Sequence, residues 1–155
     1  MTKLKVDMWM FGESHLTTDE MQATAHRLGT SGYMVTAADA AISTNSEKHT
    51  RGGVINATKK HVANVPLLDD KWHTSYHQSG ELDIAARGIC FPHGDIMVIG
   101  AYCRKSSVEE KLRCVHKWTQ GGKIPFILAA DFNLQPQEVC KTIMVGFATL
   151  AHFAF

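Results

Sequence analysis

The sequence predicts a mixed α/β fold, in which strands and helices alternate along one chain. Three observations support this class. Several short stretches are apolar at every second position or throughout, as strands are. Two longer stretches carry apolar residues at helical spacing, between residues that favour helix ends. No repeat, linker or low-complexity run interrupts the 155 residues, so we expect residues 1–155 to form a single domain.

The first two expected elements are a strand and a helix. In residues 3–11 every second residue is apolar (Leu4, Val6, Met8 and Met10). Trp9 and Phe11 occupy the other face, so we expect a strand that is buried on both sides. A helix follows, because Thr17 and Glu20 have the spacing of a capping box and Gly29 is well placed to end it. Glu13 therefore lies in the loop between strand and helix, where α/β proteins often carry functional residues.

The middle of the chain is expected to be rich in strands. Its expected strands lie at residues 33–42, 51–56, 84–91 and 96–102. The sequence PHGD at 92–95 is a strong turn signal between the last two of them. Residues 64–80 show no periodicity, and we expect a loop there.

A second helix and a final strand complete the pattern. Ser106 or Ser107 is expected to cap a helix whose apolar residues follow at steps of three and four. Two consecutive glycines after this helix end it. Residues 123–130 then form an apolar strand, and Pro136 is a residue that favours the first turn of a further helix.

Composition limits the classes of function and the compartment. Lys and Arg total 16 against 15 Asp and Glu, so the net charge of +1 provides no strong positive field for nucleic acid. We expect no signal peptide and no membrane span, because no window reaches the ~18 apolar residues of a spanning helix. The four cysteines lie far apart, so we expect reduced thiols and an intracellular protein, in the cytoplasm or nucleus.

Three polar side chains lie where strands are expected to end. Glu13 follows the first strand, and Asp131 and Asn133 follow the last one. In an extended segment, residues two apart point to the same side, so Asp131 and Asn133 would face one way. Carboxylate and amide groups suit a hard cation such as Mg²⁺ and a phosphate. The alternative is an Asx-type turn ahead of a helix, with Glu13 as an ordinary loop carboxylate.

Four segments together resemble the endonuclease/exonuclease/phosphatase superfamily of metal-dependent phosphodiesterases. Residues 126–136 (FILAADFNLQP) are similar to its G-D-F-N-x-x-P strand end, and residues 13–16 (ESHL) to its Q-E-T-H-L segment. Residues 51–55 (RGGVI) resemble its G-G-V-A-I strand start, and residues 96–102 (IMVIGAY) the strand that ends in its active-site Tyr. The four occur in the family's order over nearly the whole chain.

This resemblance implies a four-layer α-β-β-α sandwich and hydrolysis of phosphodiester bonds with Mg²⁺ or Mn²⁺. The likeness is to apurinic/apyrimidinic endonucleases and retroelement endonucleases, which implies nucleic acid as the partner. Carried over by position, Glu13 would hold the metal and Tyr102 would hydrogen-bond the scissile phosphate. Asp131 would align or deprotonate the attacking water, and Asn133 would help to stabilise the pentacovalent phosphate.

The sequence also departs from the family pattern. It has no room for a first strand with a metal-site Asn or Asp, and it lacks the closing S-D-H segment. We therefore expect a partial sandwich, truncated at both ends, whose uncovered sheet face favours self-association or coverage by residues 143–155. The alternatives are a catalytically inactive, retroelement-derived binding module and a phosphatase of the same family.

Two further features have open interpretations. The basic clusters at residues 59–61 and 104–105 are solvated turns, or they contact phosphates beside a cleft. Trp9, Trp72 and Trp118 are expected to be core or loop anchors rather than platforms for stacked bases.

Overall fold

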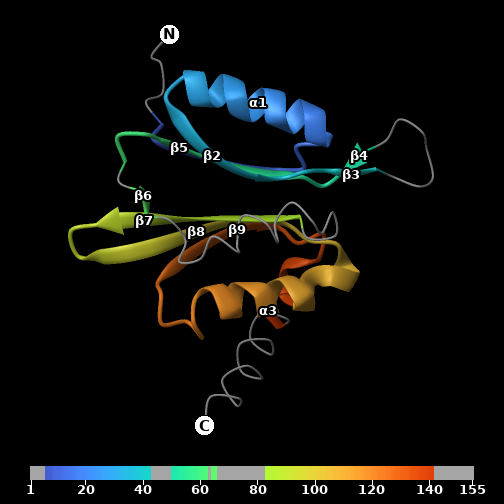
Figure 1. Ribbon diagram of the computed structural model, residues 1–155. Coiled ribbons are helices and arrows are strands. Elements are labelled where there is room, and N and C mark those ends of the chain that lie inside the picture. Colours follow the sequence, from blue (N-terminus) through green and yellow to red (C-terminus); the bar gives the residue numbers. More distant parts are fainter. Residues whose placement is uncertain (1–5, 43–49, 63, 66–82, 142–155) are drawn as a thin grey trace.

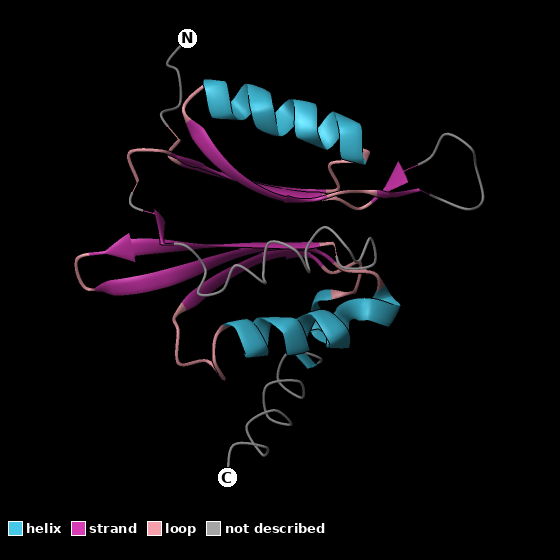
Figure 2. Cartoon of the chain, viewed as in Figure 1, coloured by secondary structure: helices cyan, strands magenta, loops and turns pink. Residues whose placement is uncertain are grey.

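Two sheets pack face to face between two helices in the computed structural model, which describes residues 6–42, 50–62, 64–65 and 83–141 (Figure 1). Helix α1 (Thr18–Thr30) covers the outer face of one sheet, and helix α3 (Val108–Trp118) covers the outer face of the other. Figure 2 shows the same four layers by type of secondary structure. This arrangement confirms the predicted α/β class and the α-β-β-α layering.

Nine strands accompany these two helices in the described ranges. They are β1 (Met8–Gly12), β2 (Tyr33–Ala38), β3 (Ala41–Ile42), β4 (Thr50–Arg51), β5 (Val54–Lys59), β6 (Asn64–Val65), β7 (Ile84–Phe91), β8 (Gly94–Tyr102) and β9 (Phe126–Asp131).

The first sheet has the strand order β1-β5-β2, and β5 is antiparallel to both neighbours. Side chains alternate along a strand, so Asn56 and Thr58 point toward the second sheet whereas Ala57 points toward α1. All three are almost wholly buried. The side-chain amide of Asn56 donates to the backbone oxygen of Ala85 in β7, at 2.7 Å, so a satisfied polar group links the two sheets.

The second sheet has the strand order β6-β7-β8-β9. Strands β7 and β8 form an antiparallel hairpin, and β9 joins β8 in parallel after the chain has crossed over through α3. The outer face of this sheet and α3 enclose the main apolar cluster. Its buried members are Ile84, Ala86, Met97, Ile99, Ala101, Cys103, Val108, Leu112 and Val115.

Helix α1 begins with the predicted capping box. The backbone N–H of Thr17 donates to Glu20 Oε2 at 3.0 Å, and the Thr17 hydroxyl donates to the same oxygen at 2.9 Å. Met21 is the fully buried residue of the helix, with 3% of its surface exposed. The helix ends at Thr30, one residue beyond the predicted Gly29.

Helix α3 also follows its prediction, with Ser107 at the N-cap. The Ser107 hydroxyl oxygen accepts the backbone N–H of Arg104 at 3.2 Å. Leu112 and Val115 are buried on the face that meets the second sheet. Spacing of apolar residues and a local cap were therefore sufficient signals for this helix.

The first strand differs from its prediction in extent and in burial. It begins at Met8 within the described part of residues 3–11. Its outer face is open, since Trp9 is 39% and Phe11 45% exposed, so the expectation of a strand buried on both sides is wrong. Among the described residues β1 pairs only with β5, and α1 packs on β2 instead. With this exposure, Trp9 is a surface residue and not a core anchor. Its ring stacks on the ring of Phe11, with the ring centroids 5.7 Å apart.

The strand expected at residues 33–42 is interrupted after β2. The chain turns there to meet the start of α1, because Ala40 donates its N–H to the backbone oxygen of Leu16 at 2.9 Å. The Thr18 hydroxyl donates to the Asp39 carboxylate at the same distance. These hydrogen bonds between residues distant in the sequence end β2, and no local sequence pattern predicts such bonds.

Two other strands begin later than predicted. The strand expected at 51–56 starts at Val54, because Gly52 and Gly53 have φ of 76° and 82°, outside the range of strands. The strand expected at 123–130 starts at Phe126.

The turn expected at 92–95 is shorter, since Phe91 pairs with Gly94 across the hairpin. The first two residues of the expected loop form β6, paired with β7, whereas residues 66–80 and the segment 143–155 lie outside the described residues. Within the described part of the chain, no helix is long and apolar enough to cross a membrane.

Candidate active site

The predicted site residues Glu13, Tyr102 and Asp131 lie at one end of the sandwich. Glu13 directly follows β1, and Tyr102 and Asp131 are the last residues of β8 and β9. Because β8 and β9 are parallel, their ends meet, and Tyr102 is the register partner of Asp131. Strand β1 packs against both of them across the two sheets. The fold thus brings together three residues that are far apart in the sequence.

Tyr102 links these three side chains electrostatically. Burial raises the pKa of its phenol, and the charge and side-chain hydrogen bond of Glu13 raise this pKa further, followed by the charge of Asp131. The positive charge of Arg104 acts in the opposite direction. The phenol is therefore protonated at neutral pH and serves as a hydrogen-bond donor at the site.

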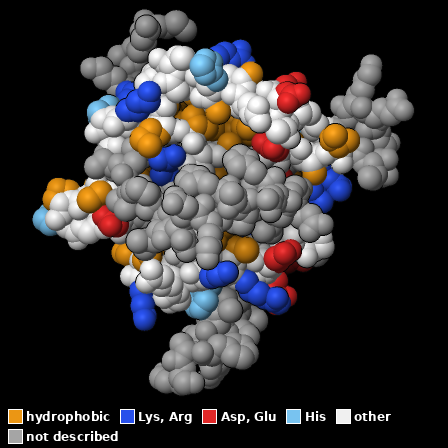
Figure 3. Space-filling model, viewed as in Figure 1, with side chains coloured by type: hydrophobic (Ala, Val, Ile, Leu, Met, Phe, Trp, Pro, Cys, Tyr) orange, Lys and Arg blue, Asp and Glu red, His pale blue; other side chains and the backbone are white. Residues whose placement is uncertain are grey.

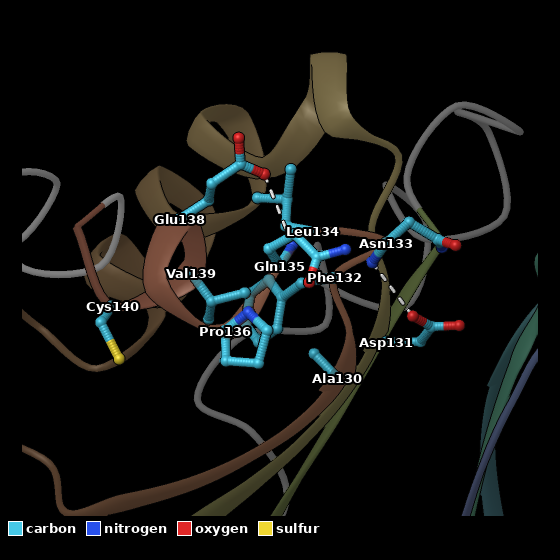
Figure 4. A pocket seen from close by; sticks show the side chains of 10 residues that line it. All are labelled: Ala130, Asp131, Phe132, Asn133, Leu134, Gln135, Pro136, Glu138, Val139 and Cys140. Carbon is cyan, nitrogen blue, oxygen red and sulfur yellow. Dashed lines mark hydrogen bonds between the residues drawn. The ribbon is translucent and has the colours of Figure 1, made fainter.

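Asp131 and Asn133 form a turn rather than one extended face. Asn133 has φ of 48°, and its backbone N–H donates to Asp131 Oδ1 at 3.0 Å (Figure 4). Its side-chain amide donates to the backbone oxygen of Cys103 at 3.2 Å. The extended segment assumed in the prediction is not observed, because the strand ends at Asp131 and the Asx-turn alternative is found instead.

A pocket of about 600 Å³ adjoins this turn. It lies between the end of β9 and the helical segment that begins, as predicted, at Pro136 (Figure 4). The lining residues are Ala130, Asp131, Phe132, Asn133, Leu134, Gln135, Pro136, Glu138, Val139 and Cys140. Glu13 and Tyr102 are outside this set, so the pocket opens beside the site and shares only Asp131 and Asn133 with it.

The loop that carries Glu13 has an uncommon backbone conformation. Glu13 and His15 have φ of 52° and 55°, in the left-handed region that residues with a Cβ rarely adopt. Such a conformation costs on the order of 1–3 kcal/mol per residue and persists only where the surroundings enforce it.

Neighbouring backbone enforces this conformation. Ser14 donates its N–H to the oxygen of Gly53 at 3.1 Å, and His15 donates to the oxygen of Gly52 at 3.0 Å. Thr50 adds a reciprocal pair, because its hydroxyl donates to the backbone oxygen of His15 at 2.6 Å and its backbone oxygen contacts the His15 ring at 2.8 Å. A side chain at Gly53 would collide with the Ser14 hydroxyl, so this close approach requires glycine.

Asp83 is a site residue that sequence reasoning missed. Its side chain is 1% exposed, and its Oδ1 accepts the backbone N–H of Gly53 at 3.0 Å. Its Oδ2 lies 3.6 Å from Nη2 of Arg104. The only signal in the sequence was an acidic residue directly before the apolar run of β7.

Asp83 is also electrostatically unusual. Burial raises the pKa of its carboxyl, although the Gly53 hydrogen bond and the charges of Lys111, Arg104 and Arg51 lower it. The net upward shift means that these favourable contacts do not fully offset the loss of hydration.

The two basic clusters have different positions. Lys59 and His61 lie 3.3 and 3.4 Å from Asp7, and the Lys60 ammonium donates to the backbone oxygen of Gly29. This cluster follows the far end of β5, roughly 17 Å of strand away from the site, so it is not beside a phosphate-binding position. Arg104, by contrast, lies at the site through its pairing with Asp83.

Charge does not gather in one field on the face drawn in Figure 3. Basic, acidic and His side chains lie dispersed around its edge. The described basic and acidic side chains on this face are interspersed, in keeping with the near-zero net charge of the sequence.

The donor set at the site fits a cation that binds together with a phosphate. Among the described residues, no three His, Cys, Asp or Glu side chains are grouped as a metal cage. Glu13 does supply an exposed carboxylate, with a second one nearby on Asp131. Mg²⁺ is typically held by one or two carboxylates, waters and substrate phosphate, so this chemistry is compatible with Mg²⁺ or Mn²⁺.

Comparison with known proteins gives structural matches only. No protein-family model and no curated protein matches the sequence. The human Nocturnin catalytic domain with bound sulfate superposes with a TM-score of 0.57 at 20% identity, covering 90% of this chain and 55% of that one. Humanized D. rerio TDP2 with 14 mutations superposes with a TM-score of 0.50 at 15% identity, covering 87% of this chain and 56% of that one.

The chain therefore spans about half the length of the solved structures that it matches. Both of these proteins are members of the superfamily that the four sequence segments resemble. The chain has the fold of the endonuclease/exonuclease/phosphatase superfamily.

Proposed function

We propose that the chain is a Mg²⁺-dependent phosphodiester hydrolase domain that acts on nucleic acid as an endonuclease. The observation that carries this proposal is the convergence of Glu13, Tyr102 and Asp131 at the ends of three strands. A carboxylate for a metal, a protonated phenol and a second carboxylate can together support metal-assisted hydrolysis of a phosphoester. The fold supports the proposal, since it is shared with a superfamily of phosphodiesterases.

Tyr102 would stabilise the charge that develops on the phosphoryl group. Attack of water on phosphorus places negative charge on the phosphoryl oxygens, and a preorganised donor to such oxygens accelerates reactions by roughly 10²–10³. The raised pKa of Tyr102 keeps this donor protonated over the physiological range. The nearby charge of Glu13 contributes to this raised pKa.

Asp131 would orient or deprotonate the attacking water. The backbone N–H of Asn133 holds Asp131 Oδ1, which fixes the carboxylate against rotation. The side-chain amide of Asn133 lies within the same turn and would donate to a phosphoryl oxygen after leaving the backbone oxygen of Cys103. General-base assistance of this kind contributes roughly 10²–10⁴ in rate.

Glu13 would hold the metal ion. When bound there, Mg²⁺ supplies Lewis-acid stabilisation of phosphoryl charge. Arg104 adds a fixed positive charge at the same end of the sandwich, where it would contact a backbone phosphate of the substrate.

Nicking of supercoiled plasmid in the presence of Mg²⁺ tests the proposal. We expect Asp131→Asn to lower the nicking rate by about 10²–10⁴, because it removes the base. Asp95→Asn is the matched control, since Asp95 is an exposed carboxylate of β8 at the opposite end of the hairpin. Equal rates for all three proteins would reject hydrolysis at this site.

The same experiment separates the alternative functions. Retention of plasmid in a gel without nicking would favour a binding module over an enzyme. Release of phosphate from a phosphomonoester, again without nicking, would favour a phosphatase.

A further inference from the structure

We propose that Asp83 is a positioning residue that holds both members of the Glu13–Tyr102 pair in place. This inference rests on the proposed function, because it assigns a role within the same site. It concerns a buried carboxylate that neither the sequence motifs nor the family resemblance single out.

Stability alone does not explain a carboxylate at this position. Asp83 is 1% exposed, and its Oδ2 accepts no hydrogen bond from the described residues. Arg104 Nη2 lies 3.6 Å away, beyond ordinary hydrogen-bond distance, and the buried Lys111 also acts on this carboxyl through its charge. Replacing a buried ion pair with apolar residues of similar volume is often neutral or stabilising. A reason for the carboxylate therefore lies in what it holds.

The side chain of Asp83 holds the corner formed by Gly52 and Gly53. Its Oδ1 accepts the N–H of Gly53 at 3.0 Å. A Cβ on Gly52 would collide with the same carboxylate, so the corner and Asp83 are in direct contact. Both glycines have positive φ, and the acceptor on Asp83 fixes the orientation of the peptide between them.

The corner in turn holds the loop that carries Glu13. The backbone oxygens of Gly52 and Gly53 are the acceptors for His15 and Ser14. If the peptides at the corner rotate, these two acceptors move together, and the left-handed conformation of Glu13 loses its support. Asp83 thus acts on Glu13 through one side-chain bond and two backbone bonds.

The backbone of Asp83 holds Tyr102. The backbone oxygen of Asp83 accepts the N–H of Tyr102 at 2.8 Å, at the end of the β7–β8 ladder. Asp83 therefore holds the backbone of Tyr102 through its own backbone, and the loop of Glu13 through its side chain. Only the second of these contacts depends on the identity of residue 83, which makes it accessible to mutation.

Amide hydrogen exchange measured by NMR tests this role without relying on activity. In Asp83→Ala we expect the amides of Ser14 and His15 to exchange about tenfold faster than in wild type, after correction for any change in global stability. The reason is that one supporting hydrogen bond is lost. Asp83→Asn retains an acceptor for Gly53 and is expected to restore the wild-type exchange of both amides.

Thr119→Ala is the control for general destabilisation. Thr119 is fully buried at the C-terminal end of α3, where its hydroxyl donates to the backbone oxygen of His116. This variant loses a buried polar contact but is expected to leave the exchange of the Ser14 and His15 amides unchanged. If Asp83→Ala does not fold, Asp83→Leu keeps the number and branching of the side-chain heavy atoms without an acceptor, and the same changes in amide exchange are expected.

Two outcomes would overturn the proposal. One is exchange of the Ser14 and His15 amides in Asp83→Ala at the rate found in Thr119→Ala. The other is equal exchange in the Asn and Ala variants. Because amide exchange is measured on the free protein, its result is independent of nicking. A protein that shows the expected exchange but no nicking would support the positioning role and reject the proposed function.

Discussion

Asn133 illustrates how the backbone of one residue decides the geometry of a site. With φ of 48°, it turns the chain away from β9 and presents its N–H to Asp131. Asparagine tolerates this left-handed conformation better than most residues with a Cβ. The turn keeps Asp131 beside Tyr102 while the chain proceeds to the helix that begins at Pro136.

Asp83 predicts a dependence of stability on pH. Its folded-state pKa is raised from 3.8, so the folded protein holds the proton more tightly than the unfolded chain does. The free energy of unfolding should therefore fall as pH rises from about the ordinary value through the raised pKa. In Asp83→Asn this part of the decrease should be absent.

Urea unfolding between pH 3.5 and 7 measures this effect. The difference in unfolding free energy between wild type and Asp83→Asn should shift in favour of the variant as pH rises. A difference that stays constant over this range would show that Asp83 titrates alike in the folded and unfolded states.

At the scale of elements, α1 depends on its local cap. Thr17→Ala removes the hydroxyl contact with Glu20 and the N-cap side chain, and we expect the free energy of unfolding to fall by about 1 kcal/mol. Thr24→Ala, in the interior of the same helix, should cost less, because alanine has the higher helix propensity. Chemical denaturation checks both values, and an equal loss in the two variants would contradict the role of the cap.

The difference between local and distant interactions also explains which elements could be predicted. The caps and apolar faces of α1 and α3 are encoded within about four residues of one another, so sequence patterns identified them. The exposed outer face of β1 depends on where α1 packs, and nothing within β1 encodes that. Both helices were therefore predicted correctly, whereas the burial of β1 was not.

The same distinction applies to the candidate site. Glu13, Tyr102 and Asp131 each end an expected strand, and their motifs could be recognised singly. The role of Asp83 depends on a bond to Gly53, thirty residues earlier in the chain, which no spacing rule can anticipate. An Asx turn and an extended segment were both compatible with the sequence at Asp131–Asn133, so the sequence could not distinguish the two conformations.

At the scale of the whole molecule, two strand edges are exposed on one side of the sandwich. Among the described residues β1 pairs only with β5 and β9 only with β8, and β1 contacts β9 across the sheets. The stacked Trp9 and Phe11 lie on β1, and Ile127 of β9 is 48% exposed. Unpaired edges with apolar side chains favour association with another chain.

We therefore propose that the chain self-associates through these edges. Light scattering should give a mass above that of the 17.1 kDa monomer, and Trp9→Ser with Phe11→Ser should lower it. Phe91→Ser is the matched control, since Phe91 is 50% exposed at the β7–β8 turn, away from both edges. A wild-type protein that stays monomeric at every concentration would contradict this proposal.

The central claim is that Glu13 and Asp131 belong to one hydrolytic site. Single-turnover nicking by wild type, Glu13→Gln, Asp131→Asn and the double variant tests it most directly. Residues that act as a unit are strongly non-additive, so we expect the double variant to be little slower than the slower single variant. Rates that multiply, or that equal the wild-type rate in all variants, would contradict a shared site.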